Sequence, residues 1–156
     1  MISVGIDISK GKSTAYILKP EGEIVDGPIT FKHTTSGLKT LTDQIPRGED
    51  EVKVVMEATG IYHLQVAIYL QEHGYFVSVI NPLEMKRFRT FGLHGVKTDK
   101  ADAMKIAEYG LACWWQLNAF QIAEDKYAEL SILSRQYRHH MGNRIRNLLG
   151  LIHMLD

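Results

Sequence analysis

The chain has 156 residues, of which 45% are hydrophobic and 23% charged, and its formal net charge is zero. This composition is typical of one globular domain with its own core, and it excludes an intrinsically disordered chain. A single cysteine, Cys113, excludes an internal disulfide framework.

The first third of the chain predicts three short strands followed by a helix. Apolar or alternating segments predict the strands, and glycine-bearing turns join them into an antiparallel meander. Their ranges are 2–9, 13–20 and 24–32. Leu38, Leu41 and Ile45 have helical spacing, which predicts a helix over 34–45.

The next part alternates strands with helices. Residues 52–60 are almost continuously apolar, which is typical of a central parallel strand. An amphipathic helix over 61–73 and a strand over 75–82 follow, and a further helix begins near Asp99. The last stretch, 124–156, reads as one long amphipathic helix.

This order of elements predicts an α/β fold. Hairpins build one side of the sheet, and right-handed β-α-β crossovers build the other. It matches a ribonuclease H-like mixed sheet flanked by helices, with a long C-terminal helix. We expect a domain over residues 1–112 and a helical extension over 113–156.

Charge is unevenly spread along the chain. Residues 1–83 hold seven Lys/Arg and ten Asp/Glu, whereas residues 84–156 hold eleven and eight. Such basic segments can contact nucleic-acid phosphates, although many are only solvated surfaces. The candidate phosphate contacts are Lys86, Arg87, Arg89, Lys97 and Lys100.

Four carboxylates stand out by position. Asp7 lies inside the first apolar strand, and Glu57 lies near the end of the fourth, where ligand sites in open α/β sheets gather. If those strands are neighbours, the two side chains can converge. Asp99 and Asp102 are three residues apart at a helix start, so they share one helix face.

Carboxylates gathered in this way would repel one another unless a cation binds between them. Mg²⁺ prefers oxygen ligands, and paired divalent ions can stabilise the attacking and leaving oxygens of a phosphoryl transfer. We therefore expect Asp7, Glu57, Asp99 and Asp102 to bind Mg²⁺ or Mn²⁺ for phosphodiester chemistry. The alternatives are a helix cap for Asp99 and strand-end hydrogen bonds for the others. His63 is a weaker candidate for a secondary role, its alternative being a surface histidine.

The segments "GIDISKGKS", "VVMEATGIYH", "INPLEMKRF" and "KTDKADA" occur in this order between residues 5 and 103. Together they resemble the N-terminal half of DEDD-type insertion-sequence transposases, the family that includes the Piv-type DNA invertases. The catalytic domain of that family is similar to the RuvC Holliday-junction resolvase. The resemblance assigns Asp7, Glu57, Asp99 and Asp102 to the D-E-D-D set, and it implies cleavage and transfer of DNA strands.

The resemblance carries further expectations. Family members have a second, C-terminal domain with a serine thought to act as the nucleophile, so we expect this chain to be part of a longer protein and inactive alone. A guide-type noncoding RNA is a partner implied by resemblance only. The alternative function is that of half of an actin-like or sugar-kinase-type ATPase, whose sequence begins with a similar hairpin that binds phosphates. Another alternative is a non-catalytic scaffold.

The sequence also predicts self-association through the final helix and a cytoplasmic location. Aliphatic residues from Leu130 to Leu155, together with Tyr137, recur in steps of three and four, so we expect homodimers or larger homo-oligomers through this helix. No charged-then-apolar leader opens the chain, and no apolar run approaches membrane-spanning length. With the low cysteine content, this predicts a cytoplasmic protein without a membrane partner.

Overall fold

The computed structural model describes residues 1–90, 99–121 and 141, and of residues 89, 90, 99 and 100 it describes the backbone only. A compact unit extends from Met1 to Phe120, beyond the boundary that we expected at residue 112. The long helix expected over 124–156, with its apolar seam, lies outside the described residues except for residue 141. In the described ranges, no helix is both long and apolar enough to span a bilayer.

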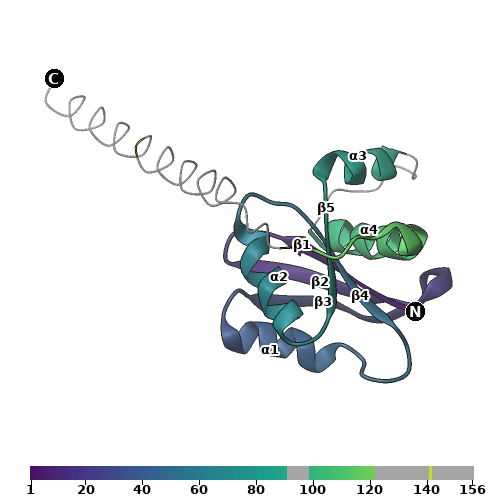
Figure 1. The fold of residues 1–156 in the computed structure, drawn as a ribbon, viewed down its shortest axis with the longest axis horizontal. Helices are drawn as coiled ribbons and strands as arrows, with labels where there is room; N and C mark the ends of the chain where they lie inside the picture. Colours follow the sequence, from purple (N-terminus) through teal and green to yellow (C-terminus); the bar gives the residue numbers. More distant parts are fainter. Residues whose placement is uncertain (91–98, 122–140, 142–156) are drawn as a thin grey trace, which may run out of the picture. The chain divides into compact units, whose positions relative to one another are not determined.

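A five-stranded mixed sheet organises this unit (Figure 1). Its strands are β1 (Ile2–Ile8), β2 (Lys12–Leu18), β3 (Ile24–Lys32), β4 (Val52–Glu57) and β5 (Phe76–Ile80), in the spatial order β3-β2-β1-β4-β5. The pairs β1–β2 and β2–β3 are antiparallel, whereas β1–β4 and β4–β5 are parallel. The predicted meander and the predicted central parallel strand are both confirmed.

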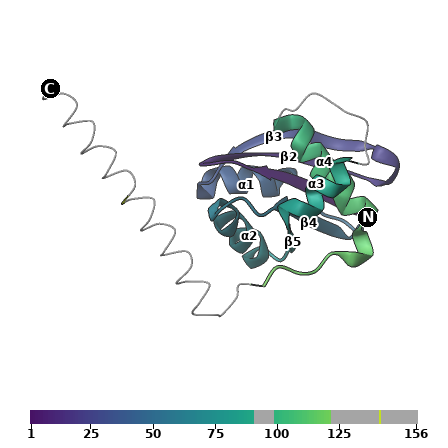
Figure 2. The same ribbon diagram turned by 90° about the horizontal axis from the view of Figure 1, so that it is seen from above.

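Helices cover the two faces of the sheet, as the two views together show (Figures 1 and 2). One face carries α1 (Thr35–Gln44) and α2 (Tyr62–Glu72), and the other carries α4 (Asp99–Ala112). The short helix α3 (Pro82–Thr90) directly follows β5 and contacts α4. Two single 3₁₀ turns lie at Pro20–Gly22 and Trp114–Gln116.

Strand alternation sorts β1 between these two faces. Ile2, Val4, Ile6 and Ile8 are buried in the main core, together with apolar residues of α1 and α2. The intervening residues point to the α4 face because successive strand side chains alternate. Ser3, Gly5 and Asp7 therefore lie beneath or beside α4.

Helix α4 packs unusually close to β1. A Cβ atom added to Gly5 would lie 2.7 Å from the Cα of Ala107, and one added to Gly110 would collide with the Ser3 side chain. Small residues at these contacts let the helix backbone approach the strand backbone directly. This contact fixes where the first turn of α4 lies relative to the strand ends.

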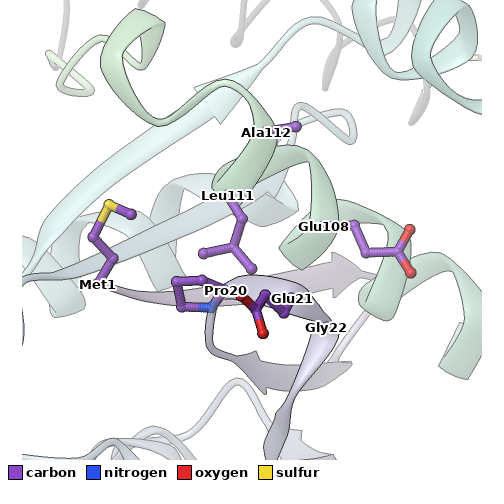
Figure 3. A pocket seen from close by; sticks show the side chains of 7 residues that line it. All are labelled: Met1, Pro20, Glu21, Gly22, Glu108, Leu111 and Ala112. Atoms are coloured by element: carbon purple, nitrogen blue, oxygen red, sulfur yellow. The ribbon is translucent and has the colours of Figure 1, made fainter.

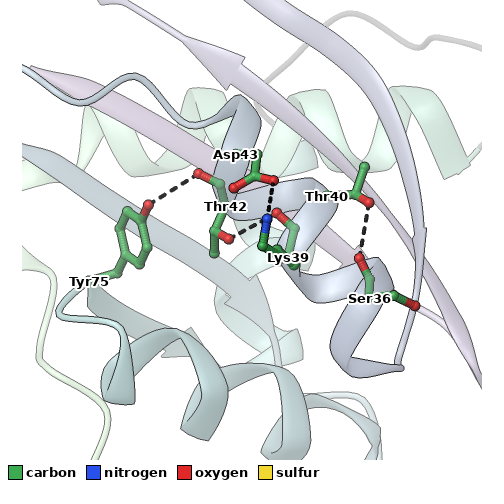
Figure 4. A network of polar contacts seen from close by, with 6 residues as sticks. All are labelled: Ser36, Lys39, Thr40, Thr42, Asp43 and Tyr75. Carbon is green, nitrogen blue, oxygen red and sulfur yellow. Dashed lines mark hydrogen bonds and ion pairs between the residues drawn. The ribbon is translucent and has the colours of Figure 1, made fainter.

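Polar contacts hold α1 in place (Figure 4). The Thr34 hydroxyl accepts a bond from the Gly37 amide at 3.2 Å, which caps the helix N-terminus. Near its other end, the Tyr75 hydroxyl donates to the Thr42 carbonyl at 3.4 Å, which joins α1 to the turn before β5. The Thr40 and Thr42 hydroxyls bond to carbonyls of the preceding turn.

A buried lysine anchors the segment after α4. The Lys53 ammonium donates to the Trp114 carbonyl at 3.0 Å and lies 4.6 Å from the Trp114 ring centroid and 4.9 Å from that of Phe76. Such cation–π contacts are favourable in desolvated surroundings. Further on, the Phe120 amide donates to the Val77 carbonyl of β5 at 2.7 Å. Residues 113–120 therefore belong to the compact unit.

Candidate metal centre

Two of the predicted carboxylates lie side by side at the carboxyl-terminal ends of the central strands. Ile6 of β1 is paired with Met56 of β4, and Asp7 and Glu57 are the next residues on each strand. Both side chains are half-buried and lie on the α4 face. Because neighbouring strands are roughly 5 Å apart, two carboxylates placed in this way can share one ion.

The two acids lie in a row that crosses the whole sheet. Asp7 pairs with Thr14 of β2, Thr14 pairs with Thr30 of β3, and Glu57 pairs with Ile80 of β5. We call Thr30, Thr14, Asp7, Glu57 and Ile80 the strand-end row. Sequence reasoning did not single out its two threonines, because their place beside Asp7 depends on strand register.

The direction of α4 brings its first turn toward the same end of the sheet. Gly110, near the helix C-terminus, lies over Ser3, whereas Ala103 lies over Gly5. The helix therefore runs opposite to β1, and its N-terminal residues lie toward Asp7. Asp102 immediately precedes Ala103 and is half-buried, and Asp99 is the first residue of the helix. All four predicted positions thus belong to one face and one end of the fold.

The described side chains do not by themselves enclose an ion. Among residues whose side chains are described, no three Asp, Glu, His or Cys form a compact ligand group. Asp7, Glu57 and Asp102 each have other interactions, and the Asp99 side chain is outside the described part. The donor set nevertheless fits Mg²⁺ or Mn²⁺ chemically, because it consists of carboxylate oxygens. A complete site would need Asp99, or a small shift of the first turn of α4.

Two of the predicted basic residues lie beside this end of the sheet. Lys86 and Arg87 are exposed on α3, which begins directly after β5, while Met85 between the helix and the core is buried. The Phe88 ring packs edge-on against Tyr109 of α4, with centroids 5.2 Å apart. The side chains of Arg89, Lys97 and Lys100 lie outside the described part.

Tyr109 also ties α3 to α4 through its hydroxyl. That hydroxyl donates to the Glu84 carboxylate at 3.3 Å. Burial, followed by the neighbouring Cys113 and Glu84, raises the pKa of Tyr109 to about 12. The phenol therefore stays protonated at neutral pH and keeps its donor role, which holds α3 against the helix that carries Asp102.

His63 does not lie with the carboxylates. It is buried in the first turn of α2, and its ring meets Phe120 edge-on with centroids 6.3 Å apart. Its helix packs against the sheet face opposite to α4. The placement gives no support to a secondary role at the site, and the alternative of a surface histidine is wrong, because α2 turns this position into the core.

A cavity of about 340 Å³ lies at the other end of the sheet (Figure 3). Met1, Leu111 and Ala112 line it together with residues of the β2–β3 connection. The start of β1 and the end of α4 meet there, whereas the carboxylates lie at the end of β1 and the start of α4. The cavity is therefore separate from the candidate metal centre.

The lowered pKa values of two histidines should make the free energy of unfolding depend on pH. Burial lowers the pKa of His33 and of His63 below the usual 6.5, and a backbone contact with Thr59 partly offsets the effect at His63. The unfolded chain then binds more protons in the window that begins near pH 6.5 and extends down to the folded-state values. We expect the free energy of unfolding to fall as pH drops through this window. Urea titrations at several pH values measure it, and His63→Gln should flatten the dependence; an equally steep dependence in His63→Gln would contradict its assignment to this residue.

The sheet order, the two layers of helices and the carboxylates at the strand ends define a ribonuclease H-like fold of the RuvC type. Residues 4–156 match the family model for DEDD transposases, whose description is "Transposase", and the chain belongs to that family. The RuvC structure of Thermus thermophilus aligns with a TM-score of 0.53 and 17% identity, covering 76% of this chain and 98% of that one. The same protein in complex with a Holliday junction substrate aligns with a TM-score of 0.51 and 18% identity, covering 77% and 99%.

Curated relatives agree with the family assignment. The pilin gene-inverting proteins of Moraxella bovis and Moraxella lacunata are each 29% identical over 147 residues, which is 92% of this chain and 44% of the relative. The chain thus spans less than half the length of these relatives. Neither the relatives nor the structural neighbours support the alternative of an ATPase half.

Proposed function

We propose that this chain is the catalytic core of a DNA recombinase that cleaves and transfers DNA strands with the help of divalent metal ions. The observation that supports it most is that Asp7, Glu57 and the start of α4 lie toward one end of the same sheet face. Membership of the DEDD transposase family favours DNA as the substrate.

Each part of the fold has a distinct task in this proposal. Asp7 and Glu57 are ligands on two hydrogen-bonded central strands, so their spacing is fixed by the sheet. Asp99 and Asp102 complete the set from α4. When bound, Mg²⁺ or Mn²⁺ would neutralise charge that develops on the phosphate oxygens. Lys86 and Arg87 on α3, with Arg89, Lys97 and Lys100, would position neighbouring phosphates.

The other proposed partners are supported only by the family resemblance or by a sequence pattern. A serine nucleophile from a second domain and a guide-type noncoding RNA follow from the family resemblance alone. Pairing of two copies through the helix predicted over 124–156 follows from the apolar stripe in its sequence. On this proposal, residues 1–156 without further chain hold metal and bind DNA weakly but do not recombine it, and the protein acts in the cytoplasm.

The direct experiment incubates the whole gene product with supercoiled donor DNA and with target DNA. The buffer contains Mg²⁺, Mn²⁺ or EDTA. We expect nicked and strand-transferred products with either metal and none in EDTA. Residues 1–156 alone, under the same conditions, should give no transfer product. Equal product in EDTA would overturn the proposal, and efficient transfer by residues 1–156 would overturn the expected need for a second domain.

A further inference from the structure

Two lysines lie directly opposite each other on the exposed part of the sheet. Lys12 of β2 is in register with Lys32 of β3, and both side chains are exposed. Like charges in this arrangement destabilise an antiparallel pair. Within the part of the chain that the structure describes, neither ammonium has a carboxylate partner. Among the described residues, no ion pair therefore offsets the repulsion between Lys12 and Lys32.

The lysine pair lies on the same sheet face as the candidate metal centre. Ile29 and Phe31 of β3 are buried in the core beneath α1, so Thr30 and Lys32 point to the other face. On β2, Lys12 is two residues from Thr14, which pairs with Asp7. From strand spacing and rise, the Cα of Lys12 is roughly 8 Å from that of Asp7.

Helix α4 leaves this part of the face open. It contacts β1, β2 and β4, and β3 is not among its principal contacts. Thr14 is buried, but Thr30, Lys32, Lys12 and the neighbouring Lys10 are exposed. The surface offers one hydroxyl and three ammonium groups, which are the groups that proteins use to contact DNA phosphates.

The turn that carries these lysines is held in place from beneath. The His33 amide donates to the Gly11 carbonyl at 3.1 Å, and its Nε2 lies 2.7 Å from the Ser13 hydroxyl. Burial lowers the pKa of His33, so this ring stays neutral at pH 7 and adds no charge to the surface. The positions of Lys12 and Lys32 are thus set by the sheet and by the His33–Ser13 contact.

We propose that Lys10, Lys12, Thr30 and Lys32 form a second phosphate-binding surface, which holds the DNA backbone on the β2–β3 side of the metal centre. Lys86 and Arg87 flank the opposite, β5 side. A DNA strand that crosses the strand-end row would then be held on both sides of the cleaved bond. This inference rests on the proposed function, because it takes DNA as the substrate.

The test measures DNA binding by the whole gene product as a function of salt, in the Asp7→Asn background so that no cleavage occurs. The variant is Lys12→Gln with Lys32→Gln, and a labelled duplex carrying the target is the probe. Loss of two phosphate contacts should reduce the slope of log affinity against log salt by about 2, and should weaken binding more than about tenfold near 0.1 M salt. The matched control is Lys19→Gln with Lys39→Gln, which removes the same charge at positions paired with Asp50 and Asp43.

A second variant separates binding from folding. Lys32→Glu replaces a repulsive cross-strand pair by an attractive one, so the free protein should melt at a higher temperature in low salt while it binds DNA more weakly. The inference would be overturned if the slope of log affinity against log salt were unchanged in both variants. It would also be overturned if affinity fell only for an RNA probe. That outcome leaves metal-dependent cleavage by the unsubstituted protein intact, so failure of this inference is distinguishable from failure of the proposed function.

Discussion

Asp7→Asn is expected to abolish DNA cleavage and strand transfer by the whole gene product. Asparagine keeps the shape of the side chain but removes the negative charge that would hold a cation. Loss of groups that only support metal ligands lowers activity by roughly 10- to 100-fold, so loss of a direct ligand should exceed about a hundredfold. Product formation on supercoiled DNA in Mg²⁺ and in Mn²⁺ measures the effect.

The fold should survive this substitution. Asp7 is half-buried beside Glu57, and removing one of two neighbouring carboxylates relieves like-charge repulsion in metal-free buffer. We therefore expect the melting temperature in EDTA to stay the same or rise. Asp43→Asn is the matched control, because Asp43 is exposed on α1 across the sheet and should leave activity unchanged. Full activity in Asp7→Asn would remove the carboxylate from the proposed chemistry.

Gly5→Ala is expected to have the largest effect on stability. The added methyl group would meet the backbone of Ala103 and Ala107, and backbone atoms cannot move aside as a flexible side chain can. Overpacking of this kind typically costs 1–3 kcal/mol, and we expect a loss near the upper end, about 3 kcal/mol. Urea denaturation of Gly5→Ala measures it. Gly48→Ala is the control, because a Cβ there would meet nothing within 4 Å.

The same substitution should also weaken activity in whatever fraction of the protein remains folded. Lifting α4 from β1 moves Asp102 away from Asp7 and Glu57, because that helix approaches the sheet through Gly5. Cleavage per folded molecule, with the folded fraction taken from circular dichroism, measures this second effect. An unchanged free energy of unfolding in Gly5→Ala would contradict the close packing of α4 on β1.

Much of the sheet was predictable because its signals are local. Glycine-bearing turns fix the two hairpins, and the apolar run before Glu57 predicts a central strand, from which the β1–β4 neighbourhood follows. Asp7 stood out because a lone acid in an apolar strand needs compensation. The family assignment and the fold class that we expected are both confirmed.

The features that could not be predicted depend on contacts between residues that are distant in the sequence. The close approach of α4 needs Gly5, Ala103 and Gly110 to meet, and nothing near any one of them in the sequence reveals it. The register of β2 with β3 decides whether Lys12 faces Lys32, and a slip of one residue would move either side chain to the other face. The burial of His63 could not be predicted, because it depends on packing against residues distant in the sequence, such as Phe120. The packing of Lys53 against Trp114 likewise joins residues that are far apart in the sequence.

The two outer strands of the sheet have different protection against aggregation. At β5, the Phe120 amide bonds to Val77 and the Phe120 carbonyl accepts from Gln71 at 2.6 Å, so a neighbouring segment covers that side. At β3, Pro28 lacks an amide hydrogen, Asp26 adds charge, and the pairing with β2 shifts register nearby. Such features discourage another chain from adding a strand. Copies of this domain could therefore lie close together, as the proposed function would place them on one DNA molecule, without their sheets joining.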